Sequence, residues 1–311
     1  MIQTANAEPE LFEASNGGFD AEVAAVRLEA TGLYRVLRKY VRPEHYTLPD
    51  KRMKRLGLVL DCETLGLAIA DPVIEVGMAA FEYDPATGTV YRILSAQSWL
   101  EDPGCPISEP IRRLTGITDA MVRGQSFDRA ELGRWVERAD IVIAHNATFD
   151  RCRLERIDPR LAAKPWACTH QGIDWAEQGV GSSKLAFLAM CYGFYFEAHR
   201  AQDDCLALLH VLANPLPLSG HGTLATLLDG ARRPVARVWA VNSAFDAKDA
   251  LKARGYGWSP GEGSQRKGWY RDCRPEDAPD ELAWLSDTIG CLGQAVSLDA
   301  YSRYSDRAFA R

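Results

Sequence analysis

The sequence predicts an α/β fold in which a mixed β-sheet is flanked by helices and followed by a small C-terminal α+β domain. Three observations support this prediction. Residues 56–100 contain three consecutive apolar, strand-like segments, and residues 109–213 combine a short buried strand with several helical segments. The Pro- and Gly-rich stretch "NPLPLSGHG" at 214–222 then interrupts the chain before a new strand-like segment.

The N-terminal region, residues 1–55, is predicted to be a helical extension. Residues 1–19 are polar and contain a Gly-Gly pair, which is typical of disorder. Asp20 is a residue type that caps helices, and "DAEVAAVRLEATGLYRVLRKYV" follows with apolar residues at roughly helical spacing around Gly32. This pattern predicts one or two short helices.

The central region, residues 56–213, is predicted to be a single domain. The segments "LGLVLDCE", "PVIEVGMAAFEY" and "GTVYRILSAQSW" predict an antiparallel meander. A helical region at 109–138 leads into the buried strand "IVIA" at 141–144. Further helices are predicted from about 149, at 184–192 and at 201–213.

Residues 214–233 are predicted to be a linker with the short helix "TLATLLDGARR", and residues 234–311 a small α+β domain. In the latter, the pattern predicts the strand "VARVWAVN", the helix "AFDAKDALKARGY", the strand "GWSP", the hairpin turn "GEGS" and the strand "RKGWYRDC".

The composition is that of an ordinary globular protein, with 311 residues, 47% hydrophobic and 25% charged. A net charge of −6 disfavours a protein whose whole surface is basic and binds nucleic acid non-specifically, but it is compatible with a local basic patch. No apolar run approaches the roughly 18–20 residues that span a bilayer, and the N-terminus lacks signal-peptide features, so we expect a cytoplasmic protein without a membrane partner. The eight cysteines form no C-x₂₋₄-C pair, which disfavours a structural zinc site.

The stretch "LVLDCETLGL" at 58–67 runs from apolar residues directly into two acids. Asp61 and Glu63 are two positions apart, so their side chains project to the same face of a strand. Carboxylates held together in this way repel each other unless a cation compensates. D-x-E also occurs at ordinary solvated strand ends, so a metal site requires support from the rest of the chain.

Two later segments repeat this pattern of polar residues beside an apolar element. "IVIAHNATFD" places Asp150 on the first turn of a helix, where an acid also stabilises the helix N-terminus by itself. "EAHRAQDDCLALLHVL" places His199 and Asp204 at the start of an apolar helix, where both also have ordinary structural explanations.

Together, D-x-E, H-N-A-x-F-D and H-x-A-x-x-D resemble the motifs of the DEDDh 3′→5′ exonucleases, over about residues 56–213. That family includes the proofreading epsilon subunit of bacterial DNA polymerase, ribonuclease T and oligoribonuclease; "LTGIT" at 114–118 and "WACT" at 166–169 add to the likeness. The resemblance implies a ribonuclease-H-like fold, a general base at His199 and four catalytic, metal-binding acids: Asp61, Glu63, Asp150 and Asp204. Asp203 is out of register with the third motif. Leu65 stands where many members have Thr or Ser, which leaves substrate preference open.

These residue types suit phosphodiester hydrolysis. The reaction needs an activated water, a neutralised phosphate and a stabilised leaving oxygen, which two divalent ions roughly 3.5–4 Å apart supply. Mg²⁺ and Mn²⁺ prefer carboxylate oxygens, so we expect two such ions as cofactors. A histidine exchanges protons near neutral pH, which suits His199 as the base.

Residues after the first motif are predicted to form the wall against the terminal nucleotide, with Asn146 hydrogen-bonding near the 3′ end. A plain turn with two core leucines is the alternative for this wall, which consists of Thr64, Leu65, Gly66 and Leu67.

The C-terminal region is basic and aromatic, with ten Lys or Arg against four acids between residues 232 and 274. Such a surface suits single-stranded nucleic acid, although Trp258 and Trp269 are equally compatible with a small core. The predicted phosphate contacts are Lys248, Lys252, Arg254, Arg266 and Lys267.

The sequence therefore predicts a metal-dependent 3′→5′ exonuclease that releases nucleoside 5′-monophosphates from nucleic acid with a free 3′ end, single-stranded DNA being favoured. The alternatives are an RNA-directed exoribonuclease of the oligoribonuclease type, or a non-catalytic nucleic-acid-binding or partner-docking module. A protein partner or homo-oligomer stays open. Because every proposed catalytic residue precedes residue 231, residues 1–230 alone are expected to hydrolyse short oligonucleotides.

Overall fold

The structure is a computed structural model that describes residues 20–261 and 265–309. The disorder predicted at 1–19, and most of the predicted hairpin turn at 261–264, lie outside the described residues. The chain forms two compact units, residues 1–38 and residues 39–311. In the described part of the chain, no helix is both long and apolar enough to cross a membrane.

The described part of the first unit contains helix α1 (Ala21–Ala30). Asp20 caps this helix as predicted, because its side chain accepts hydrogen bonds from the backbone N–H groups of Glu22 at 3.0 Å and Val23 at 3.1 Å. Gly32 has a φ of 71°, a left-handed conformation that ends helical structure, and strand β1 (Arg38–Lys39) is the next element. One helix therefore forms where one or two were predicted.

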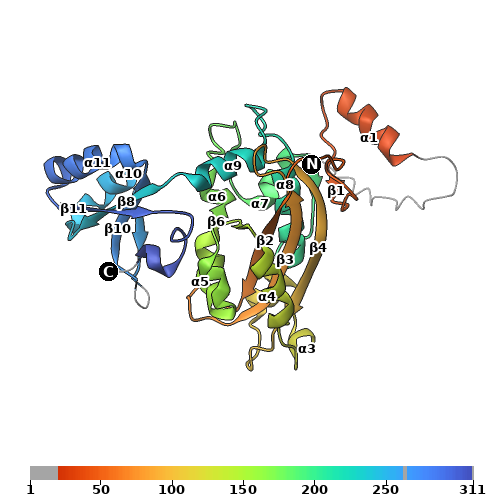
Figure 1. The fold of residues 1–311 in the computed structure, drawn as a ribbon, viewed down its shortest axis with the longest axis horizontal. Helices are drawn as coiled ribbons and strands as arrows, with labels where there is room; N and C mark the ends of the chain where they lie inside the picture. Colours follow the sequence, from red (N-terminus) through yellow and green to blue (C-terminus); the bar gives the residue numbers. More distant parts are fainter. Residues whose placement is uncertain (1–19, 262–264, 310–311) are drawn as a thin grey trace, which may run out of the picture. The chain divides into compact units, whose positions relative to one another are not determined.

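The second unit contains a five-stranded mixed sheet in the order β4-β3-β2-β5-β6 (Figure 1). The predicted antiparallel meander is confirmed and consists of β2 (Arg55–Thr64), β3 (Val73–Tyr83) and β4 (Val90–Leu100). The predicted strand β5 (Ile141–Ala144) pairs in parallel with β2. β6 (Trp166–Cys168), which the sequence did not predict, pairs in parallel with β5.

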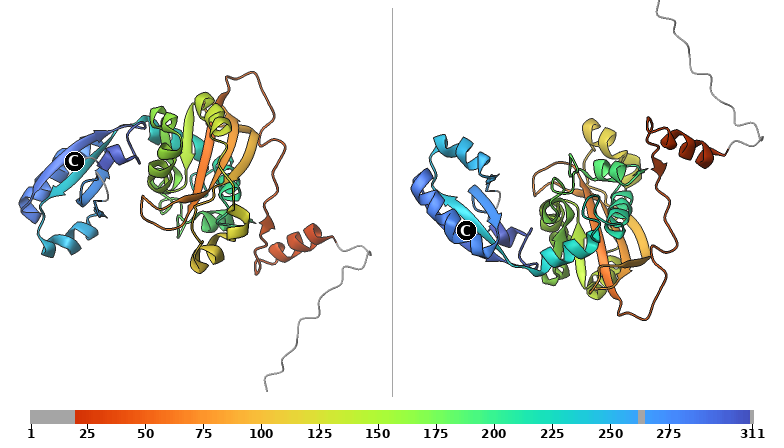
Figure 2. Two further views of the ribbon diagram at one scale, coloured as in Figure 1. Left: turned by 90° about the horizontal axis from the view of Figure 1, so that it is seen from below. Right: turned by 90° about the horizontal axis from the view of Figure 1, so that it is seen from above.

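Helices cover both faces of this sheet, as Figures 1 and 2 show. On one face, Val59, Ala79 and Phe81 pack with apolar residues of α7 (Leu185–Cys191), α8 (Ala201–Ala213) and α9 (Thr223–Arg232). On the other face, Leu58 and Met78 pack with residues of α4 (Arg129–Arg138) and α5 (Ala147–Ile157). The remaining elements of this region are α2 (Glu109–Thr115), α3 (Asp119–Val122), η1 (Pro159–Ala163), α6 (Thr169–Gly172) and β7 (Phe194–Tyr195).

The C-terminal region forms a second, four-stranded antiparallel sheet in the order β11-β8-β10-β9. The predicted strands and helix are found as β8 (Val235–Val241), η2 (Phe245–Ala247) with α10 (Lys248–Ala253), β9 (Gly257–Ser259) and β10 (Gly268–Cys273). Residues after 274, for which no elements were predicted, form η3 (Pro275–Asp277), α11 (Ala278–Trp284), the π-helix η4 (Leu285–Ile289), β11 (Leu292–Leu298) and η5 (Asp306–Phe309).

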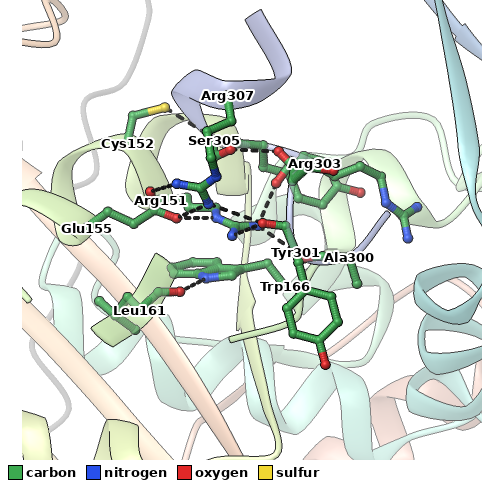
Figure 3. Close-up of polar contacts among 12 residues, drawn as sticks. Arg151, Cys152, Glu155, Leu161, Trp166, Ala300, Tyr301, Arg303, Ser305 and Arg307 are labelled. Carbon is green, nitrogen blue, oxygen red and sulfur yellow. Dashed lines mark hydrogen bonds and ion pairs between the residues drawn. The ribbon is translucent and has the colours of Figure 1, made fainter. Parts of the chain in front are cut away.

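Residues 299–309, which follow β11, return to the first sheet and contact α5 and β6 (Figure 3). The fully buried guanidinium of Arg151 donates to the carbonyl oxygens of Ala300 at 3.1 Å, Tyr301 at 2.6 Å and Arg303 at 2.7 Å. The backbone N–H of Trp166 also donates to the carbonyl of Ala300, at 2.8 Å. This C-terminal segment therefore completes the packing of the region that carries the sequence motifs.

Candidate active site

The first motif lies at the end of β2. Asp61 pairs with Gly77 and Glu63 with Glu75 across the β2–β3 ladder, and the register shifts immediately after Glu63. Asp204 lies on the first turn of α8, which packs on the same sheet. Carboxylate oxygens of Asp61, Glu63 and Asp204 all lie within 4.8 Å of one another. The structure thus brings together three of the four predicted acids, from two motifs that are far apart in sequence.

These carboxyl groups are partly buried and repel one another, which shifts their pKa values upward. Burial, with the charges of Asp204, Glu75 and Asp150, raises the pKa of Glu63 to about 8. Burial also raises the pKa of Asp204 to about 7. Asp61 has its pKa raised by burial and then by the neighbouring acids, Asp150 first among them. The donor set and its mutual repulsion fit a divalent cation with oxygen ligands.

Asp150 lies on the first turn of α5 and is held by β2. Its Oδ1 accepts hydrogen bonds from the backbone N–H of Cys62 at 3.1 Å and from the Cys62 thiol at 3.3 Å. Burial raises the pKa of Asp150 to about 7, although these bonds and the nearby Arg153 oppose the rise. Asp150 lies outside the group of three acids with ligand atoms within 4.8 Å, but its charge acts on Asp61.

His199 lies two residues before α8 and is exposed. Its φ of 67° is in the left-handed region, which non-glycine residues rarely occupy. The next residue, Arg200, donates its backbone N–H to Oδ2 of Asp204 at 3.0 Å. The residue that follows the predicted base is therefore hydrogen-bonded to one of the predicted acids.

The loop after the first motif has structural as well as candidate binding roles. The Thr64 hydroxyl donates to the carbonyl of Gly66 at 2.6 Å, and a Cβ on Gly66 would clash with Oδ2 of Asp71. Leu65 packs against a small apolar cluster, whereas the Leu67 side chain is 87% exposed. Leu67 is thus the exposed member of the four predicted wall residues.

Asn146, the predicted contact near the 3′ end, precedes α5 and is exposed with a φ of 72°. The adjacent His145 is half-buried; its Nδ1 lies 2.8 Å from the Thr169 hydroxyl, and burial together with His170 lowers its pKa to about 4. This low pKa favours the neutral form of His145 at neutral pH.

The predicted phosphate contacts lie in the C-terminal region, and two of them have partners within the protein. Lys248, Lys252 and Lys267 are exposed. Arg254 forms a 3.0 Å ion pair with Glu281, and Arg266 donates to Oε1 of Gln294 at 2.7 Å. Trp258 is 47% exposed, whereas Trp269 packs into the core of the region.

Sequence reasoning missed three charged residues beside the site: Glu75, Arg153 and Arg200. Arg153 is buried and joins α5 to the loop after the first motif by donating to the carbonyls of Leu67 at 2.8 Å and Ala68 at 2.9 Å. Glu75 is fully buried and pairs with Arg200 at 3.0 Å. The sequence did contain a signal for Glu75, because an acid within the apolar segment "PVIEVG" indicates a buried, paired carboxylate.

Comparison with known proteins agrees with this geometry. Residues 58–212 match the RNase T family model, described as "Exonuclease". A segment of the chain is 35% identical over 96 residues to the PolC-type DNA polymerase III of Pediococcus pentosaceus and 38% identical over 95 residues to that of Listeria monocytogenes. Each match covers 30% of this chain and 6% of the relative's length.

Among solved structures, exonuclease X in complex with 5′-overhanging duplex DNA is 23% identical, with a TM-score of 0.37 over 56% of this chain and 90% of that chain. Escherichia coli exonuclease I in complex with a dA16 oligonucleotide is 15% identical, with a TM-score of 0.45 over 73% of this chain and 68% of that chain.

The mixed five-stranded sheet and the acidic cluster define an α/β domain with a candidate metal site. Residues 58–212 belong to the RNase T exonuclease family, within the DEDD-type 3′→5′ exonucleases.

Proposed function

We propose that this protein is a metal-dependent 3′→5′ exonuclease that hydrolyses phosphodiester bonds from the 3′ end of nucleic acid, preferably DNA, and releases nucleoside 5′-monophosphates. The observation that carries the proposal is the convergence of Asp61, Glu63 and Asp204, whose ligand oxygens lie within 4.8 Å of one another. Such a cluster is unfavourable by itself and suits cation binding.

Asp61, Glu63, Asp204 and Asp150 would hold the ions, Mg²⁺ or Mn²⁺. Two bound ions supply an activated water and charge neutralisation at the phosphate. His199 takes the proton from the attacking water; its exposure and its position two residues before α8 leave it accessible to substrate. Leu67 and Asn146 contact the terminal nucleotide, and the exposed lysines of the C-terminal region hold the strand by phosphate contacts.

The name of the PolC-type relatives, DNA polymerase III, supports DNA as the substrate. An RNA-directed exoribonuclease is the alternative within the same chemistry. Parallel measurement of kcat/KM on single-stranded DNA, duplex DNA with a free 3′ end and short RNA separates them. Faster hydrolysis of RNA than of either DNA would overturn the DNA preference and leave the exonuclease chemistry in place.

A non-catalytic role in nucleic-acid binding or partner docking is the remaining alternative. The occupied motif positions and the clustered acids disfavour it. We also expect a cytoplasmic location, which fractionation of cells that express the tagged protein would test.

A further inference from the structure

Glu75 is a carboxylate within the apolar strand β3, and its side chain is fully buried. Its two oxygens accept four hydrogen bonds: from Ser98 Oγ at 2.8 Å, from Arg200 Nη2 at 3.0 Å and Nε at 3.3 Å, and from the backbone N–H of Ala201 at 3.1 Å. A buried acid is tolerated when its charge is paired and its oxygens are hydrogen-bonded in this way.

Three of these four bonds come from the start of α8. Arg200 is the N-cap residue of this helix and Ala201 is its first residue. Close packing fixes the same point, because a Cβ on Gly77 would clash with the backbone carbonyl of Ala201. Strand β3 therefore fixes the start of α8 through a carboxylate and, two residues later, through direct backbone packing.

His199 immediately precedes these fixed residues. A non-glycine residue keeps a φ of 67° only where the surrounding contacts hold it there. The His199 side chain is exposed, so its position depends on its backbone rather than on packing. The contacts that fix the backbone on its C-terminal side are those of Arg200 and Ala201 with Glu75, and that of Arg200 with Asp204.

We propose that Glu75 and Arg200 form a positioning pair for His199, which holds the backbone of residues 199–201 so that the imidazole is placed to accept the proton of the attacking water. This inference rests on the proposed function of His199. Neither partner needs to touch the substrate. The pair also acts on the acids, because the charge of Glu75 contributes to the raised pKa of Glu63 and Arg200 bonds Asp204, so the effect through His199 is the part that the double-mutant cycle isolates.

The test is a double-mutant cycle with Glu75→Gln, His199→Ala and the combined variant, with kcat and KM measured on a short single-stranded oligonucleotide. Glu75→Gln keeps the shape of the side chain but removes its charge, so we expect kcat to fall on the order of 10- to 10²-fold with little change in KM. In the His199→Ala background the same substitution should have no further effect, because the group that it positions is gone. Arg200→Lys, which keeps the ion pair, should lose less activity than Arg200→Met.

Asp158→Asn is the matched control. Asp158 is a buried carboxylate, paired with Arg160 at 2.9 Å, at the opposite end of α5 from Asp150. A thermal melt of each variant compares the two losses of an ion pair between a buried carboxylate and a partly exposed arginine. Only Glu75→Gln should lower kcat at a temperature where both variants are folded. Equal kcat losses in both backgrounds, or wild-type kcat in Glu75→Gln, would overturn the positioning role while leaving the nuclease assignment intact. An inactive wild-type protein would instead count against the proposed function.

Discussion

Oδ1 of Asp150 accepts a 3.1 Å hydrogen bond from the backbone N–H of Cys62, although 88 residues separate the two in sequence. Cys62 lies between Asp61 and Glu63, so the strand that carries the first motif also orients the acid of the second. The charge of Asp150 in turn raises the pKa of Asp61. The acids of the first two motifs are therefore held close enough for their charges to interact.

Removal of one acid should abolish activity without loss of the fold. Asp61→Ala and Glu63→Ala remove repulsion between like charges, so the metal-free variants should melt at or above the wild-type temperature. The rise in melting temperature that Mg²⁺ or Mn²⁺ produces in the wild type should be lost. Asp203→Ala, beside Asp204 but out of register with the motif, is the control and should stay active. Near-normal turnover in either motif variant would refute the assignment of these acids.

The stability of the metal-free protein should depend on pH in a direction set by the raised pKa of Glu63. Its pKa in the folded protein, about 8, lies above the ordinary carboxyl value of 4.5, so the folded state binds the proton more tightly than the unfolded state does. This contribution to stability is complete below about pH 4.5 and is lost as pH rises toward 8. In EDTA, the melting temperature of Glu63→Gln minus that of the wild type should therefore increase between pH 5 and pH 8. A constant difference would contradict the upward shift.

Replacement of the predicted base should separate catalysis from metal binding. His199→Ala should lower kcat at least ~10²-fold, the usual contribution of a general base. Calorimetric titration with Mn²⁺ should give an affinity close to that of the wild type, because the clustered acids stay intact. His221→Ala, in the exposed loop before α9, is the control for loss of a histidine. A large loss of metal affinity in His199→Ala would make this residue a ligand instead.

The C-terminal segment should be needed for stability of the exonuclease region, contrary to the expectation that residues 1–230 suffice for hydrolysis. Without residues 299–311, the buried Arg151 would lose its three carbonyl acceptors and Trp166 its bond to Ala300. Arg151→Met should lower the free energy of unfolding by about 3 kcal/mol, because polar groups are left buried without partners. Chemical denaturation measures this loss.

The control is Arg307→Ala, which removes an exposed partner of Glu155 and should lower the free energy of unfolding much less. A fully stable and active 1–230 fragment would refute the requirement.

The exposed lysines of the C-terminal region should contribute to strand binding. In a Glu63→Gln background, replacement of Lys248, Lys252 and Lys267 by alanine should reduce the slope of log affinity against log salt by roughly 0.7 for each lysine–phosphate interaction that is removed. Fluorescence anisotropy with a long single strand measures this slope. Arg254→Ala should change the slope less, because its guanidinium already pairs with Glu281. An unchanged slope in the triple variant would leave the region without a role in binding.

The sequence predicted features that depend on local pattern. The meander β2–β4, the strand β5 and the helices α7 and α8 follow from apolar periodicity, and the acids stand at the ends of these elements. β6 has only three residues and β11 lies in a segment without clear alternation, so neither has enough periodic signal.

What the sequence could not predict depends on interactions between distant segments. In the sequence, Arg151 looks like an ordinary helix residue. Only the structure shows that its guanidinium donates to the carbonyls of Ala300, Tyr301 and Arg303 (Figure 3). The role of Glu75 likewise depends on its hydrogen bonds to the start of α8, 125 residues away in sequence. Four acids were predicted together, of which Asp61, Glu63 and Asp204 are found within one cluster. The charged residues around them, Glu75, Arg153 and Arg200, were recognised only in the structure.

Digestion of 5′-end-labelled single-stranded DNA tests the central claim most directly, with wild type and Asp61→Ala each incubated with Mg²⁺, Mn²⁺ or excess EDTA. The wild type with metal should produce a ladder of progressively shorter labelled products and free nucleoside 5′-monophosphates. EDTA or Asp61→Ala should leave the substrate intact. Undiminished digestion in EDTA, or an intact substrate with the wild type and either metal, would contradict a metal-dependent 3′→5′ exonuclease.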